Sequence, residues 1–145
     1  MTGKYIFRED IAIADLAFEV YADNLEDLFK YSGLAITNAM IVDLNSIKPA
    51  VIKEIEMENE NIEFLLFNFL QEIIFYKDSE RLLFNRIDVK IKEEGQKYIL
   101  KALLYGEKID MNKHELLVDV KAVTMHLFEV KKINGEWFAR VIVDV

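Results

Sequence analysis

The chain has 145 residues, 52% of them hydrophobic, and a formal net charge of −8 at pH 7. This length and apolar content predict a single domain over residues 1–145 with a real core, and they exclude a disordered chain. The acidic balance argues against tight, direct binding of nucleic acid, because phosphate backbones are held by clustered lysine and arginine. The chain has no cysteine, which excludes disulfides, thiolate zinc sites and iron–sulfur clusters.

The first elements in chain order are a strand and an amphipathic helix. Residues 16–22 alternate between apolar and polar or small side chains, which predicts a half-buried strand with Asp15 at its start. The segment that follows has Asn24 as its predicted N-cap, with Asp27 three residues later. Apolar residues then recur at helical spacing as far as Met40, so we expect a helix there.

Residues 48–59 alternate again and predict a strand near a sheet edge, and a second helix is expected over residues 61–76. This second helix has a broad apolar face. Phe64 and Phe75 fall on the opposite side, among Asn68, Gln71 and Glu72. We therefore expect that the helix is covered on both sides or offers a contact surface.

The same helical segment bears on membrane association. Residues 64–76 are the most apolar stretch, but they are too short and too polar to cross a bilayer. The N-terminal residues carry acids where a signal peptide needs a clean apolar run. The sequence therefore predicts a cytoplasmic protein with no membrane partner.

The second half of the chain is typical of an antiparallel meander. Predicted strands cover residues 85–92, 97–106, 116–132 and 136–145. Asn134-Gly135 is a strong hairpin signal between the last two of them. Together with the two helices, these strands predict an α+β fold: a two-layer domain in which a predominantly antiparallel sheet packs with two main helices.

The side chains needed for enzymatic catalysis are sparse. No serine lies in a nucleophile elbow, and the two histidines are not spaced as a zinc pair. His126 shares strand parity with Ala122, Thr124 and Phe128, which predicts a packed histidine, whereas His114 lies in a polar loop and is expected to be solvated. A stand-alone hydrolase is therefore disfavoured.

Carboxylates are the remaining candidate functional groups. Asp15 opens the first full strand, Asp144 closes the last one, and the carboxylate of Val145 follows directly. If these strand ends meet, they form an all-oxygen cluster of the kind that Ca²⁺ or Mg²⁺ prefers, with Mn²⁺ a further candidate. The alternative is that Asp144 is a solvated strand end and Asp15 a turn residue.

The sequence resembles the archease family. The resemblance is carried by four stretches: YIFREDIAIADLAFEVYADNLEDLF, IEFLLFNFLQEIIFYKDSERLLF, LKALLYGEKIDMNKHELLVDVKAVTMHLFEV and WFARVIVDV. They cover most of the chain in the family's order. The resemblance implies an activator of the RtcB-type GTP-dependent RNA ligase, which seals RNA ends in tRNA splicing and RNA repair. Archeases promote guanylylation of the ligase histidine and so permit multiple turnover.

The resemblance also implies site residues. The family's divalent cation is held at positions that match Asp15, Asp144 and Val145, the same residues that the strand-end argument selects. Lys121 and His126, both in the stretch VKAVTMH, and Glu72 on the second helix are candidates for partner activation. Lys121 is alternatively a surface lysine paired with Asp119 or Glu107, and Glu72 alternatively only keeps the helix soluble.

One departure from the family pattern concerns the first acidic ligand. The family signature is His-Thr-Ala-Asp, whereas this chain has Ala12, Ile13 and Ala14 before Asp15. The chain therefore lacks the imidazole that the family signature has at this position. A second functional hypothesis is a chaperone-like modulator of RNA-modifying enzymes such as tRNA methyltransferases, acting through the surface around Phe64 and Phe75 rather than through a metal.

Overall fold

The computed structural model describes residues 2–11 and 15–145 of the chain. Within these residues the strands and helices follow in the order β1 Gly3–Phe7, β2 Leu16–Ala22, α1 Leu25–Met40, β3 Val51–Asn59, α2 Ile62–Glu80, β4 Leu82–Glu94, β5 Lys97–Lys108, β6 Ala122–Ile133 and β7 Glu136–Asp144, with a short 3₁₀ turn at Leu44–Ser46.

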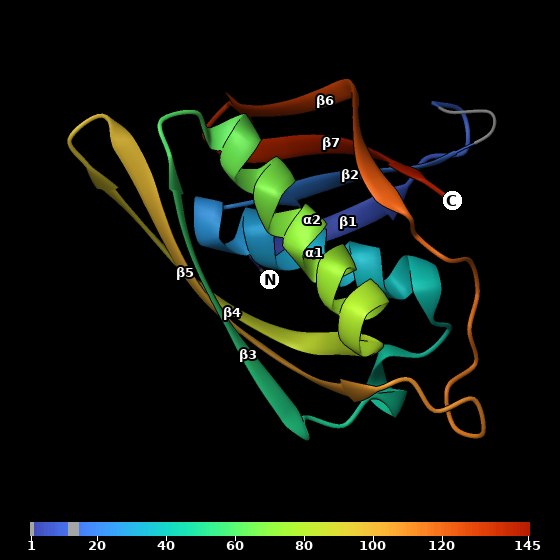
Figure 1. Cartoon of the computed structure of the whole chain (residues 1–145). Coiled ribbons are helices and arrows are strands. Elements are labelled where there is room, and N and C mark those ends of the chain that lie inside the picture. The colour runs from blue at the N-terminus through green and yellow to red at the C-terminus, as the bar shows by residue number, and fades with distance from the viewer. Residues whose placement is uncertain (1, 12–14) are drawn as a thin grey trace.

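The strands divide between two antiparallel sheets. One sheet has the order β1-β2-β7-β6 and the other the order β3-β5-β4. Both helices contact both sheets, and Figure 1 shows them lying between the sheets. The predicted α+β class, with predominantly antiparallel strands and two main helices, is confirmed. The division into two sheets was not predicted.

The meander breaks between β5 and β6. Strand β5 is already paired on both edges, with β3 on one side and β4 on the other, so it has no free edge for β6. The chain instead crosses to the other sheet, where β6 pairs with β7. Backbone hydrogen bonds of 2.9 Å from Val42 to Glu115 and of 2.8 Å from Leu117 to Met40 hold the crossing segment against the end of α1. Residues 117–121, which were expected to extend the strand, are therefore irregular.

The helix starts follow the predicted capping chemistry. The side chain of Asn24 accepts a hydrogen bond of 2.8 Å from the backbone N–H of Asp27 at the start of α1. Asn61 does the same for Glu63 and Phe64 at the start of α2. Helix α2 continues to Glu80, beyond the predicted end, and closes at Arg81, whose φ of 56° is left-handed.

Strand β1 was not predicted, because five residues beside a run of charges give little periodic signal. It pairs with β2 from Gly3 opposite Ala22 to Phe7 opposite Phe18.

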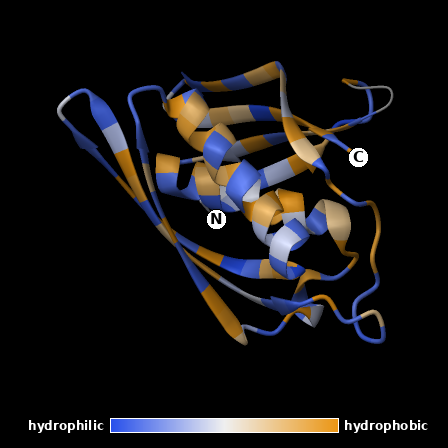
Figure 2. Cartoon of the chain, viewed as in Figure 1, coloured by the Kyte–Doolittle hydropathy of each residue, from blue (hydrophilic) through white to orange (hydrophobic). Residues whose placement is uncertain are grey.

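The two sheets and helices enclose a core that includes Phe29 and Phe69, whose ring centroids are 5.7 Å apart. Hydrophilic and hydrophobic residues alternate along the strands (Figure 2), as expected when each sheet covers the core with one face. Within residues 2–11 and 15–145, no helix is long and apolar enough to cross a membrane.

Candidate functional site

Asp15 and Asp144 lie at the same end of the four-stranded sheet. Strands β2 and β7 are antiparallel and end with the pair Leu16–Val143. Asp15 precedes that pair on one strand and Asp144 follows it on the other, and both residues are exposed. Val145 is half-buried and packs against the core. Figure 1 shows the C-terminus on the side of the molecule where β1 ends.

The first residues of β6 reach the same sheet end. The backbone N–H of Lys121 donates a hydrogen bond of 2.8 Å to the carbonyl oxygen of Asp144, and Ala122 pairs with Asp144 in the sheet. Lys121, with its exposed side chain, therefore lies directly before β6 and next to Asp144.

The alternative interpretation of Lys121 as an ion-pair partner of Asp119 or Glu107 is wrong. Asp119 accepts a hydrogen bond of 2.6 Å from Lys77, and Glu107 is engaged by Lys113 and His114. In the part of the chain that the structure describes, no salt bridge involves Lys121.

Helix α2 approaches this region through Gln71. Its side-chain oxygen accepts a hydrogen bond of 2.8 Å from the backbone N–H of Val123, two residues after Lys121. Glu72 is the next residue on the helix and is half-buried. The turn of α2 that carries Glu72 is therefore fixed against the start of β6.

The predicted packing of His126 is wrong, because the side chain is exposed. The pairing of β6 with β7 shifts register between Thr124 and Glu129, and Leu127 within this bulge has a φ of 55°. The guanidinium of Arg140 stabilises the bulge by donating a hydrogen bond of 3.0 Å to the carbonyl oxygen of Leu127. Strand parity counted from Ala122 fails once the bulge inserts extra residues.

The expected solvation of His114 is also wrong, because this histidine is 3% exposed. Its Nδ1 accepts a hydrogen bond of 2.9 Å from the backbone N–H of Asp110. The hydrogen of the neutral ring is therefore on Nε2, which donates to Glu107 over 3.1 Å. His114 fixes the loop after β5 and does not face the acidic strand ends.

Glu107 is the other half of this buried contact. Burial would raise the pKa of its carboxyl, but hydrogen bonds from Lys113, the Lys48 backbone N–H and His114 outweigh burial and lower the pKa to about 2. The Lys48 bond is 2.6 Å long and ties this loop to the chain before β3.

Sequence reasoning missed Arg8, which anchors the start of the connection that leads to Asp15. Its guanidinium binds Glu19 over 2.5 Å and Asp10 over 2.6 Å. The sequence held a signal for this contact, because Glu19 is an acid in the middle of an apolar strand. In the structure Glu19 is 7% exposed. Such a buried carboxylate requires a charged partner.

The donor set at the sheet end fits a hard divalent cation. Asp15, Asp144 and Val145 offer only oxygen atoms, the ligands that Ca²⁺ and Mg²⁺ prefer. Within the described ranges, no group of three or more His, Cys, Asp or Glu side chains is placed to hold a metal, so water or a partner would have to complete the shell. Ala12, Ile13 and Ala14, where the chain departs from the expected signature, lie outside the described residues.

Comparisons with known proteins give the family directly. The model of the Archease protein family (MTH1598/TM1083) matches residues 7–145. The chain belongs to the archease family. The protein archease of Pyrococcus abyssi is 38% identical over 133 residues, covering 91% of this chain and 93% of its own. The archease of Methanopyrus kandleri is 37% identical over 134 residues, covering 91% and 94%.

Two solved structures share the fold. The solution structure of Methanobacterium thermoautotrophicum protein 1598 has a TM-score of 0.83 and 33% identity, and covers 99% of each chain. The crystal structure of an archease from Thermotoga maritima, described as a possible chaperone, has a TM-score of 0.61 and 21% identity, and covers 95% of this chain and 97% of its own. The second likeness supports the archease fold alone.

Proposed function

We propose that this archease is a non-enzymatic activator of an RtcB-type GTP-dependent RNA ligase and acts in the cytoplasm, in tRNA splicing and RNA repair. In this proposal it holds a divalent cation with Asp15, Asp144 and Val145 and presents that end of the four-stranded sheet to the ligase. The observation that carries the proposal is the pair Leu16–Val143, because it brings the two acids to one sheet end.

The surroundings of the acids suit contact with a partner. Asp15 and Asp144 are both exposed, so a partner can reach their carboxylates. Lys121, directly before β6, and His126, within β6, are also exposed. A cation held there would supply positive charge near the GTP phosphates, which lowers the barrier to attack at phosphorus by stabilising charge. The ligase supplies the histidine nucleophile, so the archease needs none.

The test is transfer of labelled GMP to ligase, with the archease at trace amount and GTP in excess. We expect the wild type to accelerate guanylylation, and Asp15→Asn or Asp144→Asn to abolish the acceleration while circular dichroism stays unchanged. Asp23→Asn is the matched control, because Asp23 is an exposed acid just after β2, at the other end of that strand. Wild-type-like acceleration by both site variants would contradict the proposal.

A second candidate function is chaperone-like modulation of RNA-modifying enzymes such as tRNA methyltransferases. It is favoured by helix α2, where Phe64 is 48% exposed and Phe75 is 54% exposed. The two rings are 11 residues apart, which on an α-helix places them on one face, about 16 Å from each other. Exposed aromatic side chains of this kind are typical of protein interaction surfaces.

The two candidates are separated by Phe64→Ser combined with Phe75→Ser. This double variant should lose suppression of aggregation of a partner methyltransferase if the helix face carries the chaperone-like role. Asp144→Asn should leave suppression intact. Suppression that depends on Asp144 and not on the two rings would contradict the second candidate.

A further inference from the structure

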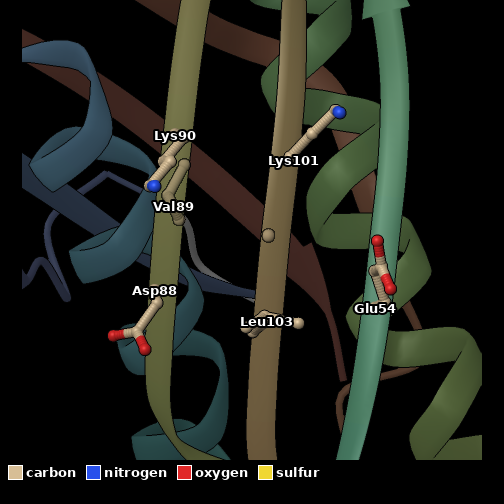
Figure 3. A pocket seen from close by; sticks show the side chains of 7 residues that line it. Glu54, Asp88, Val89, Lys90, Lys101 and Leu103 are labelled. Carbon is tan, nitrogen blue, oxygen red and sulfur yellow. The ribbon is translucent and has the colours of Figure 1, made fainter.

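The three-stranded sheet leaves one whole face uncovered. Its inner face packs on α1 and α2. Each of its three strands contributes four residues to the outer face, in matching rows: Ile52, Glu54, Glu56 and Glu58 from β3; Tyr105, Leu103, Lys101 and Ile99 from β5; and Arg86, Asp88, Lys90 and Lys92 from β4. Figure 3 shows part of this outer face, with Glu54, Asp88, Lys90 and Lys101 standing on the near side of the sheet and the helices behind it.

Charge is separated across the outer face. Edge strand β3 contributes three acids, the other edge strand β4 contributes three bases and Asp88, and the centre is Lys101 among apolar side chains. Ile52 and Leu103 are 57% and 37% exposed. The formal charges of the face cancel, although the whole chain carries −8. The net charge of this face therefore does not oppose its contact with a second copy.

The basic side of the face is only partly paired within its own chain. Arg86 binds Asp88 and Lys92 binds Glu94, each over 3.1 Å, whereas no salt bridge of the described residues involves Lys90. Lys90 and Lys101 are directly opposite each other in the sheet, and like charges in such a pair destabilise it. The nearest acid of Lys101 is Glu56, at 3.8 Å. A hollow of about 380 Å³ between these strands, lined by Glu54, Asp88, Lys90, Lys101 and Leu103, can receive side chains from outside.

We propose that the outer face binds a second copy of this chain, with the two-fold axis running along β5. A rotation about that axis exchanges the two edges, so the acidic β3 of one copy faces the basic β4 of the other. Glu56 and Glu58 then face Lys90 and Lys92, because the sheet register places each of these pairs in one row. Strands of the two copies run in similar directions, as in aligned packing of sheets.

The apolar residues of β5 fall on the axis, so Ile99 and Leu103 each meet their own counterpart. Two rows oppose like charges. Lys101 meets its own counterpart on the axis, and Glu54 faces Asp88, although Arg86 of the neighbouring row binds Asp88 over 3.1 Å within each chain. A face of three strands and four rows measures on the order of 300 Å² in plan, well below the roughly 800 Å² per partner of a stable interface. The dimer is therefore weak and held largely by charge.

Sedimentation equilibrium of the full chain tests the dimer. We expect a concentration-dependent dimer at 1 mM in low salt that weakens at about 0.5 M NaCl, because salt screens exposed ion pairs. Lys90→Glu with Lys92→Glu should abolish it. The control is Lys4→Glu with Lys132→Glu, which changes net charge equally on the four-stranded sheet and should reduce dimer formation far less.

Mixing gives the decisive result. Glu56→Lys with Glu58→Lys makes the face basic on both edges, and Lys90→Glu with Lys92→Glu makes it acidic on both. Each variant should be monomeric alone, and the two should associate when mixed, at least tenfold more tightly than the wild type with itself. A wild type that stays monomeric at 1 mM, or a mixture that does not associate, would overturn the proposal.

Discussion

At the scale of single residues, the two histidines show how burial depends on partners that sequence alone does not reveal. His114 is buried because the backbone N–H of Asp110 and the carboxylate of Glu107 satisfy both ring nitrogens. His126 is exposed because a bulge removes it from the strand alternation. Neither the hydrogen-bond partners of a loop histidine nor a β-bulge produces a periodic pattern in the sequence. The predicted environments of His114 and His126 were therefore both wrong.

The Glu107 contact makes stability depend on pH. Since its pKa falls from 4.5 to about 2 on folding, the ionised form stabilises the native state above pH 4.5. That contribution is lost as pH falls from about 4.5 towards 2. We expect Glu107→Gln to lower the melting temperature at pH 7 and the difference from wild type to close near pH 2.

Thermal melts by circular dichroism from pH 7 to pH 2 provide the measurement. Glu115→Gln is the control, because it removes one negative charge from an exposed position at the end of the same loop. A wild type and a Glu107→Gln variant that melt together at pH 7 would show that the carboxylate does not stabilise this loop.

At the scale of elements, the strands and helices were predictable because their periodicity is local. Asn24 and Asn134-Gly135 marked a helix start and a hairpin, and both are where the sequence placed them. Sheet membership was not predictable, since it depends on β5 being paired on both edges by strands from before and after α2. The pattern of a strand records which face is covered, but not which neighbour it pairs with.

Gly106 supports the junction between β5 and the bulge in β4. A Cβ at this position would be 1.8 Å from the carbonyl oxygen of Leu83, and the register of β4 shifts between Phe84 and Arg86 just beyond. A backbone oxygen cannot move aside like a side chain. We expect Gly106→Ala to destabilise the fold by about 3 kcal/mol, the upper end of the usual cost of overpacking.

Urea unfolding measures this cost. Gly95→Ala is the control, because Gly95 has a φ of 66° but open space around its Cβ position, so only the backbone strain of about 1 kcal/mol applies. Equal stability of the two variants would mean that β4 shifts freely and that Gly106 is not needed for close approach.

At the scale of the whole molecule, the candidate site joins segments from opposite ends of the chain. The sequence predicted Asp15 and Asp144 as neighbours because one acid opens a strand and the other closes one. The pairing of β2 with β7 in the middle of a sheet confirms that these strand ends meet. The hydrogen bond from the Lys121 backbone to Asp144 was not predictable, since it depends on the crossing between sheets.

A C-terminal extension provides a test of Val145. Adding a Gly-Ser tail converts the terminal carboxylate to a neutral amide, and the affinity of an all-oxygen site depends on its charged ligands. We expect C-terminally extended protein to activate the ligase less than untagged protein, whereas the same tail at the N-terminus has no such effect. Equal activation by the untagged, N-terminally extended and C-terminally extended proteins would show that the Val145 carboxylate is not a ligand. Asp15 and Asp144 would then have to bind the cation together with backbone oxygen atoms and water.

The central claim is that a divalent cation binds at the end of the four-stranded sheet, and the melting temperature of the free protein in Ca²⁺ or Mg²⁺ tests it most directly. An ion at about 100 times its dissociation constant stabilises the native state by roughly 2.7 kcal/mol. For a domain of this size the midpoint should rise by about 9 °C. We expect this rise in wild type and Asp23→Asn and its loss in Asp144→Asn. A wild-type midpoint that does not move at millimolar cation, or an Asp144→Asn variant that keeps the full rise, would contradict the account.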